Sequence, residues 1–217
     1  RLDNVRWPES EPVADWSQGT PLSYMREIVD YWRNQYDWRR WENKLNAFGQ
    51  YKTKLDGLDI HFLHVRSPHE DALPIVITHG WPGSVTEFYK IIDPLTNPTA
   101  HGGSAEDAFH VVCPSLPGYG FSERPAETGW GVEKTGRTWG KLMARLGYAR
   151  YVAQGGDWGA IVTQSMGITE TEHCAAIHIN MPIVTPDPDT MNDLTETEQK
   201  ALADMGSYHD HDSGYSK

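Results

Sequence analysis

The chain of 217 residues has a formal net charge of −11, and 38% of its residues are hydrophobic. This length and composition allow one sizeable core and favour a single domain over two. The negative charge argues against binding to nucleic acid, whereas it leaves small uncharged ligands unaffected. No apolar run reaches the roughly 18 to 20 residues of a membrane span, and no signal peptide opens the chain, so we expect a soluble, cytoplasmic protein without a membrane partner.

The two cysteines of the chain, Cys113 and Cys174, are 61 positions apart. Each lies in or beside an apolar, strand-like run. This setting predicts two buried free thiols rather than a disulfide or a metal-binding pair.

Residues 1–49 form the first of three expected parts, an extension rich in Trp, Tyr and charge. Apolar side chains recur at helical spacing in Leu22–Asn34 and in Asp37–Ala47, which predicts two amphipathic helices. Trp38 and Trp41 share one face of the second helix. Packing on a core explains such an aromatic stripe better than cofactor binding does.

Residues 50–182 have the pattern of an α/β core. A hairpin joined through Asp56-Gly57 comes first, and later apolar runs flanked by Gly, Pro or Asp predict strands buried on both faces. Their alternation with helices predicts a mostly parallel sheet with an antiparallel N-terminal hairpin. The expected strands are Tyr51–Leu55, Ile60–Val65, Leu73–Thr78, Phe109–Cys113, Tyr151–Gln154 and Ala175–Ile179, and the expected helices are Val85–Ile92, Val132–Leu146 and Gly159–Met166.

Distinctive segments follow three of these strands, at the carboxyl ends where such sheets bind ligands. They read HGWPGS, PSLPGYGFS and GGDWG. In the last, Gly155 and Gly159 stand two positions before and after Asp157, which matches the strand-to-helix elbow that carries a nucleophile. Larger side chains at the two glycines would crowd the neighbouring strand and helix. A helix-capping role is the alternative for Asp157, and its place after a buried strand favours the nucleophile.

An aspartate nucleophile predicts attack on an sp3 carbon and a covalent ester, rather than the acyl transfer of a serine enzyme. The backbone N–H groups of Trp81 and Trp158 are expected to form an oxyanion hole for hydrolysis of that ester. We predict an apolar substrate site and expect neither a cofactor nor a metal. The expected substrate-binding residues are His79, Pro82, Tyr119, Phe121 and Trp158, although a histidine placed like His79 more often has a structural role.

In this order and spacing, the three motifs resemble those of the microsomal-type epoxide hydrolase family. RWPE at Arg6–Glu9 and WSQGTPL at Trp16–Leu22 also resemble the extension that wraps the core of these enzymes. The resemblance covers nearly the whole chain and implies an α/β-hydrolase fold. It further implies that Asp157 opens an epoxide, that a His–acid pair activates water to release a vicinal diol, and that tyrosines of a lid assist ring opening. The implied partners are a small apolar epoxide and water.

Residues 183–217 resemble only the start of that lid, with a helix-like stretch LTETEQKALADM. After Asp157 the histidines are His173, His178, His209 and His211, and none follows a late strand as the family's base does. We therefore expect the base, the acid and the lid tyrosines to lie beyond Lys217 or on a second chain. The remaining expectations are that Tyr208 and Tyr215 are not the ring-opening acids and that His209–Asp212 form a solvated loop rather than a metal site.

Two other functions stay open on the sequence. A haloalkane dehalogenase also uses an aspartate elbow, often followed by a tryptophan such as Trp158 that holds the departing halide. A non-catalytic fragment is the third hypothesis, because no base is recognised in the chain.

Overall fold

The structure, a computed structural model, describes residues 1–184 and 186–216, with side chains up to residue 214. The chain divides into two units, Arg1–Asn180 and Met181–Lys217. The expected division into three parts, 1–49, 50–182 and 183–217, stays a prediction.

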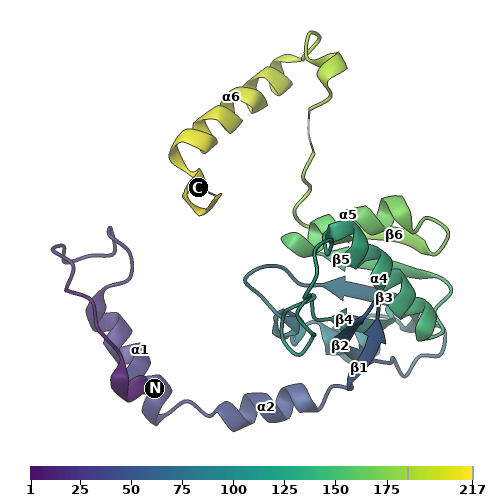
Figure 1. Cartoon of the computed structure of the whole chain (residues 1–217), viewed down its shortest axis with the longest axis horizontal. Coiled ribbons are helices and arrows are strands. Elements are labelled where there is room, and N and C mark those ends of the chain that lie inside the picture. The colour runs from purple at the N-terminus through teal and green to yellow at the C-terminus, as the bar shows by residue number, and fades with distance from the viewer. Residues whose placement is uncertain (185, 217) are drawn as a thin grey trace. The chain divides into compact units, whose positions relative to one another are not determined.

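The first unit contains two N-terminal helices and an α/β core (Figure 1). Its helices are α1 (Leu22–Asn34), α2 (Trp38–Asn46), α3 (Ile92–Thr96), α4 (Val132–Arg145) and α5 (Trp158–Thr169). Its strands are β1 (Gln50–Leu55), β2 (Leu58–Val65), β3 (Leu73–Thr78), β4 (Phe109–Pro114), β5 (Tyr151–Gly155) and β6 (Cys174–Ile179). Short 3-10 turns lie at Leu2–Asn4, Val85–Phe88, Pro98–His101 and Ala105–Asp107.

The six strands of the described sheet lie in the order β1-β2-β4-β3-β5-β6. β1 pairs antiparallel with β2, and β2 pairs antiparallel with β4. The pairs β3-β4, β3-β5 and β5-β6 are parallel. The predicted α/β class, with a mostly parallel sheet and an N-terminal hairpin, is confirmed. Asp56 and Gly57 both have positive φ, 47° and 90°, as the tight turn of such a hairpin requires.

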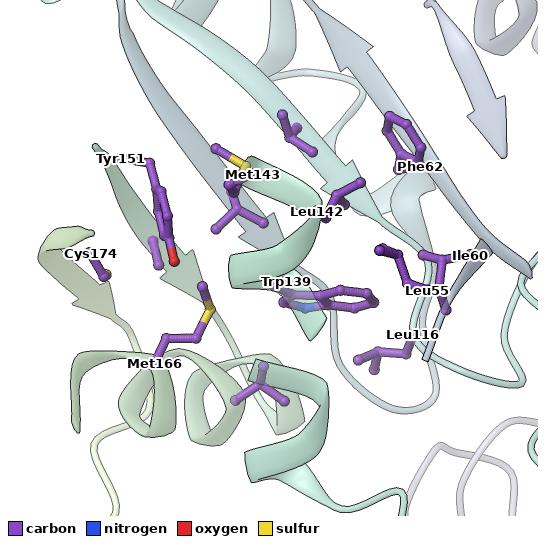
Figure 2. Close-up of a cluster of buried hydrophobic side chains, with 14 of the residues drawn as sticks. Leu55, Ile60, Phe62, Leu116, Trp139, Leu142, Met143, Tyr151, Met166 and Cys174 are labelled. Atoms are coloured by element: carbon purple, nitrogen blue, oxygen red, sulfur yellow. The ribbon is translucent and has the colours of Figure 1, made fainter. Parts of the chain in front are cut away.

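Alternate side chains of the strands build a core on each face of the sheet. On one face, α4 and α5 cover a cluster that includes Ile60, Val76 and Trp139, shown in part in Figure 2. On the other face, Ile77 and Val111 pack against Phe88 and other apolar residues of the segment after β3. Both cysteines are buried free thiols, as predicted. The rigid strands therefore fix the positions of the loops at their carboxyl ends.

One predicted helix, Val85–Ile92, is wrong. The structure has a 3-10 turn at Val85–Phe88 and a separate short helix, α3, that begins at Ile92. Pro94 explains the break, because proline is tolerated in the first turn of a helix but disrupts its interior.

The predicted strand at Ala175–Ile179 is present as β6, but it is not buried on both faces. Four consecutive residues, Ala175–His178, are exposed. β6 lies at the end of the described strand order and has a single neighbour, β5. Its exposed residues follow from that terminal position.

The second unit contains α6 (Glu196–His211) and 3-10 turns at Pro188–Thr190 and Ser213–Ser216. The prediction of a solvated loop at His209–Asp212 is wrong, because His209, Asp210 and His211 form the last turn of α6. None of the helices in the described residues is long and apolar enough to cross a membrane.

Candidate active site

Asp157 stands on a sharp turn between β5 and α5. Its backbone has φ 51° and ψ −129°, a conformation that residues other than glycine rarely adopt. A Cβ at Gly155 would overlap the carbonyl oxygen of Gly159, and a Cβ at Gly159 would overlap the carbonyl oxygen of Thr78. The two glycines thus allow the close approach that holds the elbow in its strained form.

The loop after β3 brings a backbone donor to the Asp157 carboxylate. The Trp81 N–H donates to Asp157 Oδ1 at 2.6 Å. A Cβ at Gly80 would overlap the Asp157 side chain, so this approach also depends on a glycine. Trp158 is the first residue of α5, where backbone N–H groups have no acceptor within their own helix. The structure therefore places one predicted oxyanion donor on the carboxylate and the other at the adjoining helix start.

His79 lies behind this loop and is 1% exposed. Its Nδ1 lies 2.9 Å from the Gly80 carbonyl oxygen, and its Nε2 accepts the Leu116 N–H at 3.1 Å. Both contacts suit a neutral ring protonated at Nδ1, and burial lowers the pKa of His79. The side chain joins the loop after β3 to the loop after β4. This is a supporting position, and contact between His79 and a substrate stays a prediction.

An apolar cavity of about 480 Å³ opens beside the elbow. It is lined by Trp81, Leu116, Pro117, Tyr119, Pro125, Trp130, Gly131, Val132, Thr135, Trp158 and Val162. The Thr135 hydroxyl donates to the Gly131 carbonyl oxygen at 2.9 Å, so that proton is already used within the protein. The structure thus gathers two of the predicted substrate-binding residues, Tyr119 and Trp158, around one cavity together with Trp81.

Two predicted substrate-binding residues lie outside this lining. Phe121 is 66% exposed, and its ring packs edge-on against His61 with a centroid distance of 5.3 Å. Pro82 is exposed, one residue beyond Trp81. The structure brings neither residue to the cavity, and contact of Pro82 or Phe121 with a substrate stays a prediction.

The fold matches those of known proteins. Residues 74–210 match the family model described as "alpha/beta hydrolase fold". The chain belongs to the α/β-hydrolase fold family. Residues 1–88 match a second model, "Epoxide hydrolase N terminus". Together these matches confirm the expected fold and the resemblance of the N-terminal extension.

Similar proteins within the α/β-hydrolase family carry epoxide hydrolase names. A protein of Stigmatella aurantiaca, whose epoxide hydrolase name is provisional, is 56% identical over 99% of this chain and 49% of its own length. "Epoxide hydrolase 1" of Oryctolagus cuniculus is 42% identical over 85% of this chain and 41% of its own. The solved structure of the Aspergillus niger epoxide hydrolase is 32% identical with a TM-score of 0.79, covering 99% of this chain and 56% of that one. The chain thus spans about half the length of the relatives it matches.

Sequence reasoning missed part of the cavity wall of this α/β hydrolase. Pro125, Trp130, Val132 and Thr135 lie between the PGYGFS motif and the first turn of α4, where no motif marked them. The sequence does contain one indication that Trp130 lies near the site, because this residue immediately precedes Gly131, the N-cap of α4. In this family a helix that begins at the carboxyl edge of the sheet starts beside the ligand site.

The histidines after Asp157 are spread over the α/β hydrolase chain. His173 is bonded to the Ala149 carbonyl oxygen at 2.9 Å and lies at the amino ends of β5 and β6, opposite the elbow. His178 lies on β6 and lines an apolar groove on the sheet face. His209 and His211 belong to the second unit. In the part of the chain that the structure describes, no group of three or more His, Cys, Asp or Glu residues is placed to hold a metal ion.

Proposed function

We propose that the protein is an epoxide hydrolase and that this chain supplies the residues for its first chemical step. The observation that carries the proposal is the Asp157 carboxylate on a strained elbow with the Trp81 N–H on Oδ1. An elbow in this family commonly presents a serine, so the carboxylate selects a different electrophile. The epoxide hydrolase names of the relatives support the same reaction.

In the proposed first step, the second carboxylate oxygen, Oδ2, attacks one carbon of the epoxide ring. A bond forms between Oδ2 and that carbon while the bond from the carbon to the ring oxygen breaks. The ring oxygen leaves with the electron pair and takes a proton, from a ring-opening tyrosine in the whole fold or from water in this chain alone, giving a hydroxyalkyl ester of Asp157. The Trp81 N–H holds Oδ1 at 2.6 Å and so orients Oδ2 for attack.

Oδ1 becomes the carbonyl oxygen of the ester and stays at the Trp81 N–H. Attack of water on the ester carbon would place negative charge on this oxygen, where the donor already lies. The Trp158 N–H, at the positive end of α5, is proposed as the second donor. The proton of the attacking water goes to a base, and the products are the vicinal diol and the free Asp157 carboxylate.

We further propose that the base, its acid and the ring-opening tyrosines come from the rest of the fold, in the same protein or on a second chain. The exposed face of β6 and an apolar groove of about 730 Å³ beside it support this. Ile75, Val152 and Ile177 are among the residues that line the groove. Sheets of this class normally bury such surface. A cytoplasmic location stays a prediction.

The proposal predicts a trapped ester when the chain alone is exposed to an epoxide. Intact-mass and peptide mass spectrometry after incubation with styrene oxide should show one added styrene oxide mass on Asp157. The ester should persist, because the described part of this chain has no base placed to activate water. Asp157→Asn should abolish this adduct. Asp187→Asn, which removes an exposed carboxylate of the second unit, is the matched control and should leave it unchanged. Failure of the folded chain to react at Asp157 would contradict the proposal.

Trp158 keeps haloalkane dehalogenation as a second candidate. Its side chain is 50% exposed and lines the cavity directly after the nucleophile, where it could hold a departing halide. Parallel incubation with a bromoalkane decides between the two reactions. Bromide release that outpaces styrene oxide adduct formation on Asp157 would favour dehalogenation.

A further inference from the structure

Trp130 lines one of two cavities that meet at the start of α4. It lines the apolar cavity beside Asp157 and packs, partly buried, against the core cluster under α4. A polar cleft of about 840 Å³ lies next to it, lined by Asp56, Gly129, Gly131, Val132, Glu133, Lys134, Arg137 and Lys141. Gly131 and Val132 line both cavities, so the start of α4 separates them.

Lys134 reaches back over the Trp130 ring from the first turn of α4. Its Nζ lies 4.3 Å from the ring centroid, well inside the range of a cation–π contact. The lysine is only partly exposed, so its aliphatic stem is also held against the protein. The cation–π contact and the core contact together restrict the motion of the Trp130 ring.

We propose that Trp130 is a specificity-determining residue that favours epoxides bearing a flat aromatic substituent, and that Lys134 is the positioning residue for its ring. The inference rests on the proposed function, because it takes the apolar cavity as the substrate site. A flat substituent entering that cavity meets the indole beside the Trp81 and Trp158 rings of the elbow loops. Aromatic rings gain free energy from offset or edge-to-face contact beyond the area they bury, whereas short alkyl chains do not.

The test compares the rate of adduct formation on Asp157 with styrene oxide and with 1,2-epoxybutane. Each variant is scored by the ratio of the two rates relative to the unmodified chain, which cancels the intrinsic reactivity of the epoxides. Trp130→Ala should lower this ratio about threefold to tenfold, and Trp130→Phe should lower it less. Lys134→Met should lower it about twofold, whereas Lys134→Arg should keep it, because arginine restores the cation over the ring.

Matched controls come from aromatic and cationic residues outside the cavity lining. Trp38 is 55% exposed on α2, and Lys90 Nζ lies 5.8 Å from the Tyr89 ring centroid. Trp38→Phe and Lys90→Met should leave the ratio unchanged. Near-ultraviolet circular dichroism and the urea midpoint verify that each variant is folded. If Trp130→Ala does not fold, Trp130→Phe and Lys134→Met decide the outcome.

A binding arm keeps this inference separate from the proposed chemistry. Ligand-observed NMR compares the binding of 1-phenyl-1,2-ethanediol with the binding of 1,2-butanediol. Neither diol can alkylate Asp157. Preference for the phenyl diol that falls in Trp130→Ala and Lys134→Met supports the inference, even where no adduct forms and the proposed function fails. An unchanged preference in folded Trp130 variants overturns it, whether or not Asp157 is alkylated.

Discussion

At the scale of single residues, the elbow depends on glycines, because a Cβ at their positions would overlap neighbouring atoms. Gly159 faces the carbonyl oxygen of Thr78, a backbone atom that cannot move aside without distorting β3. We expect Gly159→Ala to lower the free energy of unfolding by about 1–3 kcal/mol, the usual cost of overpacking. It should also slow alkylation of Asp157, because the strained conformation would relax. Urea denaturation and the styrene oxide adduct assay measure the two effects.

Gly206→Ala is the control, because a Cβ there meets no atom within 4 Å and the residue lies inside α6. Alanine should stabilise the helix at that position by about 0.5–1 kcal/mol. Equal destabilisation by the two substitutions would show that the elbow is not the sterically limited site.

Single residues around the elbow and the cavity differ in how far the sequence predicts their positions. The elbow at Asp157 can be predicted because the glycines two positions before and after it record a steric requirement that is local in the chain. The place of Trp130 in the cavity wall is harder to predict, because it depends on the folded position of the loop before α4, and the sequence marks it only by its place before the start of a helix. Phe121 lies in a predicted motif but turns toward His61 instead of the cavity. Motif position therefore located the elbow, whereas the cavity wall depended on tertiary structure.

At the scale of elements, α6 begins with a complete capping box. The Thr195 side chain accepts the Glu198 N–H, and the Thr195 N–H and Oγ1 each donate to Glu198 Oε2 at 2.7 Å. We expect Thr195→Ala to destabilise α6 by about 0.5–2 kcal/mol. Circular dichroism at 222 nm along a thermal scan should show earlier loss of helix.

Thr197, two residues further along the same turn, is exposed and lies outside the capping box. Thr197→Ala should therefore keep or slightly raise helix content, since alanine is the better helix former. A loss of helix from Thr197→Ala that matched the loss from Thr195→Ala would contradict the capping argument.

Sequence patterns predicted the existence of elements better than their extents. The predicted helix at Leu22–Asn34 agrees with α1 at both ends, because its apolar spacing is regular and proline precedes it. The predicted helix at Val85–Ile92 is broken in the structure. The break is attributed to Pro94, which lies two residues beyond the apolar pattern that predicts the helix. β6 was predicted as a strand from its apolar run, but its exposure depends on its neighbours in the sheet.

At the scale of the whole molecule, buried histidines should make the fold sensitive to mild acid. His61 and His79 are 4% and 1% exposed, and both ring nitrogens of each have polar contacts within the protein. Burial lowers the pKa of both side chains, with the charge of Lys52 adding to the effect at His61 and the Gly80 carbonyl opposing it at His79. The folded state therefore keeps these rings neutral at pH values where the unfolded chain takes up protons.

The sign follows from proton linkage. A histidine with a depressed folded pKa contributes its full stability above its unfolded pKa of roughly 6.5, and this contribution declines as the pH falls toward the folded pKa. The urea midpoint should therefore decrease from pH 7.5 to 5.5, a window chosen above the range in which carboxylates titrate.

His61→Gln and His79→Gln should each flatten this dependence of the midpoint on pH, although they lower the midpoint at pH 7.5 by removing polar contacts. His101→Gln, on an exposed histidine that contacts Asp93, is the control and should retain the slope. A midpoint that is constant or rises on acidification would show that His61 and His79 do not couple folding to pH in this way.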